Sequence, residues 1–302
     1  MDRRTDNRFR SVLRVATDHL RTCLSDAPAG SGGTPYLDAL VLLAHASSMT
    51  TEQLFAAFED QIGDSALARY DSFIADRCGG LPVSYIRGVK EFFGRDFLIG
   101  PGVLVPRPET EILVESMLEE IDRLDHNMPH VHDCCTGSGC VAVTIAGERS
   151  CTVTASDISE EALSYARRNA VVLDAPSIAF WNGDLLAPLG VRIAERETTR
   201  PAIIAANPPY IADNEVDNLT ERGWPEPTLA LAGGQDGLLI IRRLVQEAVA
   251  CLSSGGCLVI EIGAGQGPAT VGLFEAAGFD EVSLIRDLSG HDRVCKGRWY
   301  RR

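Results

Sequence analysis

Four consecutive residues, Asn207, Pro208, Pro209 and Tyr210, have the groups needed to hold a planar nitrogen, and they follow the apolar run 202–206. Two prolines remove two N–H donors and stiffen the backbone, which leaves carbonyl oxygens free. The Asn207 amide oxygen and the Pro208 carbonyl can both accept hydrogen from one NH₂ group, and Tyr210 offers a flat face to it. Hydrogen bonds from the NH₂ group to these acceptors stabilise the positive charge that develops on the nitrogen when it attacks a methyl group. A merely stiffened turn explains the prolines but leaves Asn207 and Tyr210 unexplained.

Three segments at the ends of predicted strands have residues suited to a nucleoside cofactor. Asp157 follows the second predicted strand, about 20 residues beyond a glycine turn, where it can accept hydrogen bonds from ribose hydroxyls. Its alternative role is to cap the next helix, which Ser159 can also do. Asp184 follows the third predicted strand and can border an adenine base. The glycine turn lets the backbone approach a ligand and consists of Cys135, Thr136, Gly137, Ser138 and Gly139.

The glycine turn also indicates which cofactor to expect. A dinucleotide site needs the spacing Gly-x-Gly-x-x-Gly, which seats a pyrophosphate at a helix N-terminus. Residues 137–139 read Gly-Ser-Gly, but the third glycine of that spacing is absent. A sulfonium cofactor has no pyrophosphate, and a chain with a net charge of −14 tolerates its cation. We therefore expect S-adenosylmethionine, whose methyl group would pass to the nitrogen held by residues 207–210.

Strand-like and helix-like segments alternate from residue 109 onward. Such alternation predicts an α/β fold, with a parallel, doubly wound, Rossmann-like sheet that has helices on both faces. The predicted strands span 130–135, 151–156, 177–181, 202–206, 257–262 and 281–285. The predicted helices span 109–124, 140–149, 160–173, 238–252 and 269–277.

The first part of the chain has a different pattern. Apolar residues recur at helical spacing within 8–77, with N-cap candidates at 48–51, which predicts a small all-α bundle. Residues 82–108 alternate short apolar pieces with Gly and Pro, which predicts a β-hairpin or an extended linker. The domains expected are a helical domain over 1–80, a hairpin and linker over 81–108, and the α/β domain over 109–302.

The composition excludes several classes of protein. Of the 302 residues, 45% are apolar and 23% charged, as in soluble globular proteins, and neither a bilayer-spanning run nor a secretory signal is present. We therefore expect a cytoplasmic protein without a membrane partner. The charge of −14 argues against a nucleic-acid partner.

The nine cysteines are scattered, which predicts reduced thiols rather than a disulfide framework. His126, His130, His132 and Cys134 lie close enough in sequence to gather a metal ion. Part of that run has the pattern of an inward-facing strand, so we expect no metal site.

Several further segments carry a family resemblance. Residues 85–88 and 91–94 read Tyr-Ile-Arg-Gly and Glu-Phe-Phe-Gly, and residues 105–111 read Val-Pro-Arg-Pro-Glu-Thr-Glu. Residues 226–237 contain Glu-Pro and then Ala-Leu-Ala-Gly-Gly-Gln-Asp-Gly, and residues 286–294 contain Arg-Asp-Leu-Ser-Gly and then Arg-Val. Together with Asn-Pro-Pro-Tyr, these segments resemble the HemK/PrmC-type protein-(glutamine N5) methyltransferases, which modify peptide-chain release factors.

This resemblance implies a seven-stranded class I methyltransferase sheet with a C-terminal hairpin, preceded by a helical substrate-recognition domain. It implies that the substrate is the glutamine of a GGQ loop in a release factor. We also expect the chain to act as a monomer. The reaction would be carried by Asn207, Pro208 and Tyr210, with Pro209 also contacting the substrate amide. Cofactor contacts carry over to Cys135, Thr136, Gly137, Ser138, Gly139, Asp157, Leu185 and Asn207.

Other readings stay open at this point. Asn-Pro-Pro-Tyr also occurs in nucleic-acid adenine and guanine amino-methyltransferases, from which the segment 105–111 separates this chain. Many members of the family have glycine where this chain has Cys135. Cysteine occurs there in the branch that methylates a ribosomal-protein glutamine, which is the nearest alternative. A non-catalytic module that only binds the cofactor is a third class.

Overall fold

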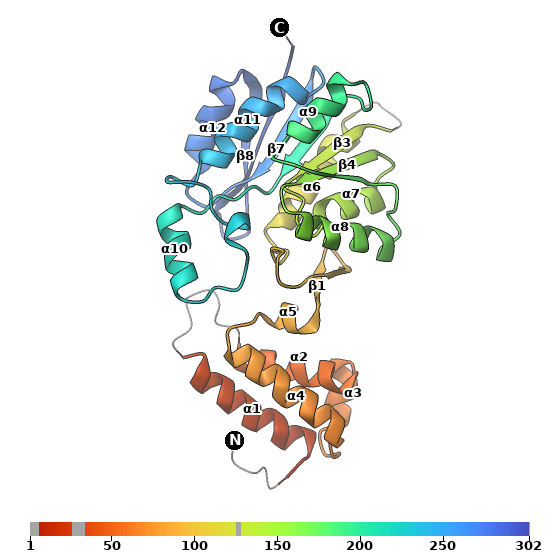
Figure 1. Ribbon diagram of the computed structural model, residues 1–302, viewed down its shortest axis with the longest axis vertical. Coiled ribbons are helices and arrows are strands. Elements are labelled where there is room, and N and C mark those ends of the chain that lie inside the picture. Colours follow the sequence, from red (N-terminus) through yellow and green to blue (C-terminus); the bar gives the residue numbers. More distant parts are fainter. Residues whose placement is uncertain (1–5, 26–33, 125–127, 302) are drawn as a thin grey trace. The chain divides into compact units, whose positions relative to one another are not determined.

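The computed structural model describes residues 6–25, 34–124 and 128–301 (Figure 1). None of the helices in these ranges has both the length and the apolar content to cross a bilayer.

The chain forms two compact units. The first contains the residues up to Val89 together with 218–225, and the second contains 90–217 and 226–302. The three-part division expected from the sequence, with breaks after residues 80 and 108, stays a prediction.

The first unit is built from helices, as the apolar spacing indicated. Its buried side chains include Val12, Leu43, Leu54 and Ile74, one from each of the four longer helices in this part. Thr50 caps the third helix in a capping box with Gln53, which confirms the N-cap expected near it. The helices are α1 (Phe9–Cys23), α2 (Pro35–Ser47), α3 (Thr51–Ala56), α4 (Asp64–Cys78) and α5 (Val83–Arg87).

A disulfide in this unit shows that the cysteine prediction was wrong. Cys23, at the end of α1, and Cys78, at the end of α4, are bonded, with Cα atoms 5.5 Å apart. They stand 55 residues apart in sequence and meet only because α1 and α4 pack against each other. The other seven cysteines are free thiols.

The predicted hairpin is present, and a short helix precedes it. Strands β1 (Val89–Phe92) and β2 (Arg95–Leu98) form a two-stranded sheet. Phe93 and Gly94 join them with φ angles of 51° and 72°, the backbone of a tight hairpin turn. Helix α5 lies where the sequence indicated extended backbone.

The second unit contains a seven-stranded sheet in the order β5-β4-β3-β6-β7-β9-β8. The first five strands in this order are parallel, and β9 runs antiparallel to both of its neighbours. A short turn joins β8 to β9, and such a turn can only connect antiparallel strands. The strands are β3 (His130–Cys134), β4 (Thr152–Asp157), β5 (Ala179–Asn182), β6 (Ile203–Ala206), β7 (Gly256–Glu261), β8 (Phe279–Arg286) and β9 (Asp292–Trp299).

All five helices predicted for this part of the chain are present, with bounds that differ by one to a few residues. The sequence did not predict α9, α10 or the 3-10 helix η1, because each is too short to show a sustained helical period. The helices that follow β2 are α6 (Thr110–Asp122), α7 (Cys140–Glu148), α8 (Glu160–Val172), α9 (Ala187–Ala194), α10 (Asp213–Glu221), η1 (Thr228–Ala230), α11 (Leu239–Cys251) and α12 (Gly267–Ala276).

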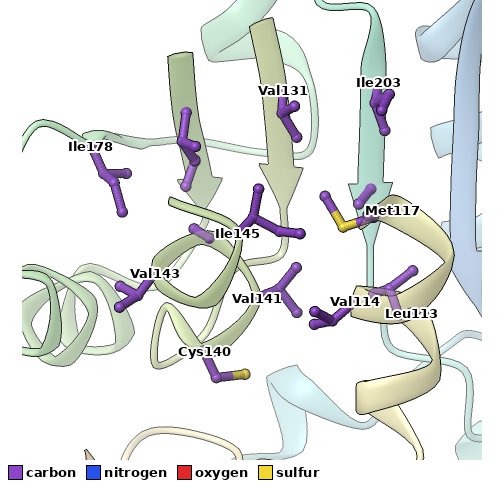
Figure 2. Packing of buried hydrophobic residues seen from close by; sticks show 14 of the residues in the cluster. Leu113, Val114, Met117, Val131, Cys140, Val141, Val143, Ile145, Ile178 and Ile203 are labelled. Atoms are coloured by element: carbon purple, nitrogen blue, oxygen red, sulfur yellow. The ribbon is translucent and has the colours of Figure 1, made fainter. Parts of the chain in front are cut away.

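Alternating side chains of the central strands enter two cores, one on each face of the sheet. Ile203 of β6 belongs to the core shared with α6 and α7, whereas Ile204 belongs to the core shared with α9, α11 and α12. Figure 2 shows the first of these cores, where Met117 of α6 and Ile145 of α7 lie near Val131 and Ile203. Burial on both faces accounts for the nearly continuous apolar runs in these strands.

The strand order reverses between β3 and β6. After β3 the chain continues outward through β4 and β5, whereas β6 and β7 lie on the other side of β3. Cys134 pairs with Ala206 at the ends of these two strands, so the glycine turn and the Asn-Pro-Pro-Tyr loop leave the sheet side by side. In doubly wound folds, ligands bind at this position.

Candidate active site

A cavity of about 330 Å³ lies at the carboxyl edge of the sheet, a volume suited to a small-molecule ligand. Its walls come from the loops after β3, β4, β5 and β6, from the segment that leads into α6, from residues 227–232 and from the start of α11. The predicted site residues that line it are Cys135, Thr136, Gly137, Ser138, Asp157, Asp184, Leu185, Asn207 and Pro209. Three others, Gly139, Pro208 and Tyr210, do not contribute to the lining.

The turn after β3 has left-handed backbone at three positions, Cys135, Gly137 and Gly139, with φ angles of 59°, 56° and 79°. Glycine adopts this conformation freely, whereas a residue with a Cβ is strained there by roughly 1–2 kcal/mol. A Cβ on Gly139 would lie 3.0 Å from the Cβ of Ala166 on α8. Gly139 therefore shapes the turn from outside the cavity, by allowing α7 to begin against α8.

Asp157, the last residue of β4, ties the glycine turn to the next strand. Its Oδ2 accepts a 2.8 Å hydrogen bond from the Gly137 amide, and its Oδ1 accepts one of 2.8 Å from the Ser159 amide. Ser159 caps α8 through a 3.2 Å bond from Ala162, so Asp157 is not the helix cap. Burial raises the pKa of Asp157 more than the amide donors lower it. Because a carboxylate has about four acceptor positions, Asp157 retains capacity for ligand hydroxyls.

Asp133 lines the same cavity but was not predicted as a site residue. It is 1% exposed, and its Oδ2 accepts hydrogen bonds of 2.6 Å from the Thr136 hydroxyl and 3.2 Å from the Ala142 amide. Burial raises the pKa of Asp133 to about 7 in spite of these donors, and the charge of Asp157 adds to the rise. Two buried acids beside one cavity favour a cationic ligand.

The loop after β5 contributes one charged and one apolar residue. Asp184 accepts a 2.6 Å hydrogen bond from Arg243, and both side chains remain about half exposed. Leu185 is buried with a φ of 45°, and its carbonyl accepts a 3.0 Å bond from the Ser156 hydroxyl. This bond holds Leu185 in the cavity wall despite its unusual backbone.

Asn207 is the first residue after β6, and its side-chain amide has a defined orientation. Its Nδ2 donates a 3.1 Å hydrogen bond to Oγ1 of Thr110, the buried first residue of α6. No group in the described part of the chain bonds Asn207 Oδ1, which leaves that acceptor to a ligand in the cavity. The sequence alone does not indicate Thr110 as a partner of Asn207, because 97 residues separate the two.

The rest of this loop is held from behind the cavity. Pro208 is buried, and Pro209 forms part of the wall. The Tyr210 hydroxyl donates to Oε1 of Glu261 at 3.4 Å, and the Tyr210 carbonyl accepts a 2.9 Å bond from Gln266. Burial raises the pKa of Tyr210, so its hydroxyl stays protonated as a donor.

A glycine-rich stretch packs directly on the backbone of this loop. The Ile211 amide donates to the Leu231 carbonyl at 2.9 Å, and the Gly233 amide donates to the Ile211 carbonyl at 2.8 Å. A Cβ on Gly233 would lie 2.8 Å from Tyr210 Cα, and one on Gly237 would lie 2.5 Å from the Tyr210 carbonyl oxygen. Both glycines are required because the two backbones touch.

The segment that precedes α6 is fixed by Glu226, whose side chain is 1% exposed. Oε1 of Glu226 accepts a 2.9 Å bond from the Val105 amide, and its Oε2 pairs with the guanidinium of Arg107, which lines the cavity. Two of the segments on which the family resemblance rests therefore meet at one wall of the cavity.

The histidines considered for a metal site have other partners. His130 Nε2 and His132 Nδ1 each lie 2.8 Å from Oγ1 of Thr154, and burial lowers the pKa of His132 to about 3. His126 lies outside the described residues. Within the described ranges, no group of three or more potential metal ligands comes together.

The strand order and the position of the cavity are those of the class I methyltransferase fold. The fold matches that of the solved delta-N METTL16 MTase domain with a TM-score of 0.50 at 15% identity, over 66% of this chain and 86% of that one. Residues 16–88 match the family described as the PrmC N-terminal domain.

Relatives of known name extend over nearly the whole chain. The chain is 41% identical to the release factor glutamine methyltransferase of Neisseria gonorrhoeae over 277 residues, which cover 89% of this chain and 96% of the relative. It is 37% identical to the enzyme of the same name from Bacillus subtilis, over 84% of this chain and 88% of that relative. The chain belongs to the family of release factor glutamine methyltransferases.

Proposed function

We propose that this protein transfers the methyl group of S-adenosylmethionine to the side-chain amide nitrogen of a glutamine in the GGQ motif of peptide-chain release factors. The observation that carries the proposal is that Asn207 lines the cavity and that its amide oxygen, unlike its amide nitrogen, has no partner in the described chain. Family membership supplies the substrate class, since the relatives are named for release factor glutamine.

The residues of the cavity fit this cofactor. S-adenosylmethionine supplies an electrophilic methyl group on a sulfonium, and its other polar groups include a ribose diol. Asp157 would hold the ribose hydroxyls with its remaining acceptor positions, and Asp133 would favour the cationic end of the molecule. The glycine turn at 135–139 would receive the amino-acid portion, and Leu185 would contact the base.

Asn207 and Pro208 would then hold the target amide. In the described chain, neither Asn207 Oδ1 nor the Pro208 carbonyl accepts a hydrogen bond, so each has an unused acceptor position for one hydrogen of an NH₂ group. Asn207 lines the cavity, whereas Pro208 is buried beside it. Acceptors at both hydrogens favour positive charge on the nitrogen as it becomes a nucleophile. Orientation toward the methyl group supplies the rest of the rate through proximity, and the nitrogen loses its extra proton after transfer.

The charge of the cavity supports a protein amide over a nucleic acid. Three acids, Asp133, Asp157 and Asp184, and two arginines, Arg107 and Arg243, line it. Both arginines are paired with carboxylates, Arg107 with Glu226 and Arg243 with Asp184, so Asp133 and Asp157 are left to repel a phosphate backbone. We also propose that the protein acts as a monomer in the cytoplasm. Sedimentation of the purified protein, alone and with a release factor, tests the stoichiometry.

The test is methyl transfer from labelled S-adenosylmethionine to a purified release factor. The matched controls are a GGQ-to-GGA release factor, a ribosomal protein with a glutamine substrate site, and a duplex DNA. We expect label only on the wild-type release factor. Label on the ribosomal protein alone, or on DNA, would replace the proposed substrate with that one.

Two variants separate the roles of the site residues. Asn207→Ala should lower kcat about 10²-fold or more, the scale of losing an electrostatic contact in a transition state, with little change in cofactor affinity. Asp157→Ala should mainly raise the dissociation constant of the cofactor. Unchanged turnover in Asn207→Ala would exclude the reaction centre proposed here.

A further inference from the structure

The side-chain amide of Gln266 binds three backbone segments at once from outside the cavity lining. Gln266 directly precedes helix α12 and is partly buried. Its Nε2 donates hydrogen bonds to the Tyr210 carbonyl at 2.9 Å and to the Gly237 carbonyl at 3.1 Å. Its Oε1 accepts a 2.9 Å bond from the Gly263 amide. The loop after β6, the glycine-rich stretch and the turn after β7 are therefore joined by one side chain.

The three partners determine which way this amide points. A backbone carbonyl can only accept a hydrogen bond, and a backbone N–H can only donate one. The Nε2 of Gln266 must therefore face the carbonyls of Tyr210 and Gly237, and its Oε1 must face the N–H of Gly263. The two N–H donors of the amide match the two carbonyls, whereas a glutamate of the same shape has no donor when it is ionised.

The residue that joins these segments is itself fixed. The backbone N–H of Gln266 donates to the Gly263 carbonyl at 2.9 Å, so Gly263 and Gln266 exchange two hydrogen bonds across a turn. The Gln266 carbonyl accepts a 2.9 Å bond from the Thr270 amide, which begins the hydrogen bonding of α12. The side chain of Gln266 therefore extends from a backbone that is held on both sides.

Two of the joined segments line the cavity and touch each other beside it. Asn207 and Pro209 line it from the loop after β6, and residues 229, 230 and 232 line it from the stretch that leads to Gly237. A Cβ on Gly237 would lie 2.5 Å from the Tyr210 carbonyl oxygen and 2.8 Å from Nε2 of Gln266. Carbonyl oxygens that converge repel each other unless a donor lies between them, so Nε2 sets how closely the two segments approach.

We infer that Gln266 is a positioning residue for methyl transfer, which fixes the loop that contains Asn207 against the glycine-rich stretch at 231–237. The inference rests on the proposed function, since that reaction requires Asn207 to hold a target amide in line with the methyl group. A displacement of about 1 Å can lower the rate of such a step about 10²-fold. The cofactor contacts proposed at 135–139, 157 and 185 lie on other loops, so cofactor affinity should depend little on Gln266.

Gln266→Glu tests this role most directly, because it keeps the shape of the side chain and removes its donors. The ionised carboxylate would face two carbonyl oxygens and push the two segments apart. In labelled methyl transfer to a release factor, we expect kcat to fall about 10²-fold. The dissociation constant of S-adenosylmethionine should change by no more than about threefold. Gln266→Met, which has a similar length and no donor, should also lower kcat.

A matched control makes the same chemical change at an exposed position. Gln246 lies on the exposed side of α11 and does not line the cavity. Gln246→Glu adds the same charge to the protein as Gln266→Glu does, and it should keep the kcat of the wild type. A loss of kcat in Gln266→Glu alone would therefore depend on the position of the change and not on its charge.

Two comparisons separate positioning from a loss of stability. Phe274→Leu removes volume from a fully buried side chain of the same helix, so it should lower the urea concentration at which the protein unfolds and keep kcat. In the Asn207→Ala background, Gln266→Glu should lower kcat by less than about 10-fold, because the side chain that it positions is already absent. A purely structural role would lower kcat by the same factor in both backgrounds.

The possible outcomes are distinguishable. Wild-type kcat in Gln266→Glu, equal losses with and without the Asn207 amide, or a loss of kcat matched by a loss of cofactor binding would overturn the inference and leave the proposed function intact. Absence of methyl transfer by the wild type would overturn the proposed function and, with it, this role for Gln266.

Discussion

Replacing Asp133 with asparagine should stabilise the protein at neutral and alkaline pH while weakening its cofactor site. The folded state raises the pKa of Asp133 from 3.8 to about 7, chiefly through burial. An acid with a raised pKa contributes stability that is fully present below its unfolded pKa and is lost as the pH rises through its folded pKa. Each pKa unit corresponds to about 1.4 kcal/mol, so ionising Asp133 should lower the free energy of unfolding by about 4 kcal/mol above pH 7.

An asparagine has nearly the same shape and does not ionise. Its Oδ1 can accept the hydrogen bonds that Thr136 and Ala142 donate to Asp133 Oδ2. The advantage of Asp133→Asn over the wild type should therefore grow by about 2–3 kcal/mol between pH 5 and pH 8. Urea unfolding of the cofactor-free protein at several pH values measures this difference. Tryptophan fluorescence in a Trp224→Phe background reports on the second unit, which contains Trp181 and Trp299.

A control with the opposite sign checks the reasoning. The Arg293 guanidinium and the amides of His291 and Ser289 lower the pKa of Asp287 to about 2, so its stabilising effect is present above pH 4 and lost in acid. Asp287→Asn should therefore lower stability at pH 7. If wild type and Asp133→Asn had parallel stability curves from pH 5 to pH 8, the buried carboxylate would not be the source of the pH dependence.

Three further changes test the local geometry. Cys135→Gly removes a cysteine whose backbone is in the left-handed region. The free energy of unfolding should change by no more than about 1 kcal/mol, because the relieved backbone strain offsets the added entropy of the unfolded chain. Calorimetric titration with S-adenosylmethionine should show equal or tighter binding. Gly237→Ala would place a Cβ 2.5 Å from the Tyr210 carbonyl oxygen, so steady-state kinetics should show a larger loss in kcat than in cofactor binding. Cys78→Ser opens the disulfide to Cys23, which closes a separation of 55 residues, and should cost about 4 kcal/mol by loop entropy; thermal unfolding in oxidising buffer, compared with wild type plus reductant, measures that loss.

The elements that sequence analysis predicted best are those with a sustained period. Apolar runs such as 203–206 are buried on both faces of the sheet, and burial of this kind is visible in the sequence as a continuous apolar run. Short elements were not predicted, because they contain too few turns to show a helical period. Helix α9, for example, spans only Ala187–Ala194. Helix α5 was not predicted for another reason: the Gly and Pro residues around it are equally compatible with extended backbone.

The candidate site was predictable where its residues follow strands directly. Topology brings the carboxyl ends of β3, β4 and β6 to one edge, so Gly137, Asp157 and Asn207 could be grouped without knowing a single contact. Thr110 could not be found in this way. It contacts Asn207 only through a hydrogen bond between segments far apart in sequence, and threonine is common in any helix or strand.

The two acids with a pKa raised to about 7 lie on the two strands that flank β6. Asp133 lies on β3, and Glu261 is the last residue of β7. Asn207 directly follows β6, which runs between them. Each acid opposes folding near neutral pH, so the apolar cores on both faces of the sheet must offset their cost. A cationic cofactor would relieve the cost at Asp133, which lines the cavity, whereas Glu261 is not among the residues that line it. Cofactor binding should therefore stabilise the wild type more than Asp133→Asn, and should stabilise Glu261→Gln as much as the wild type. Thermal shifts with and without S-adenosylmethionine measure both differences, and equal shifts in all three proteins would show that Asp133 does not sense the cofactor charge.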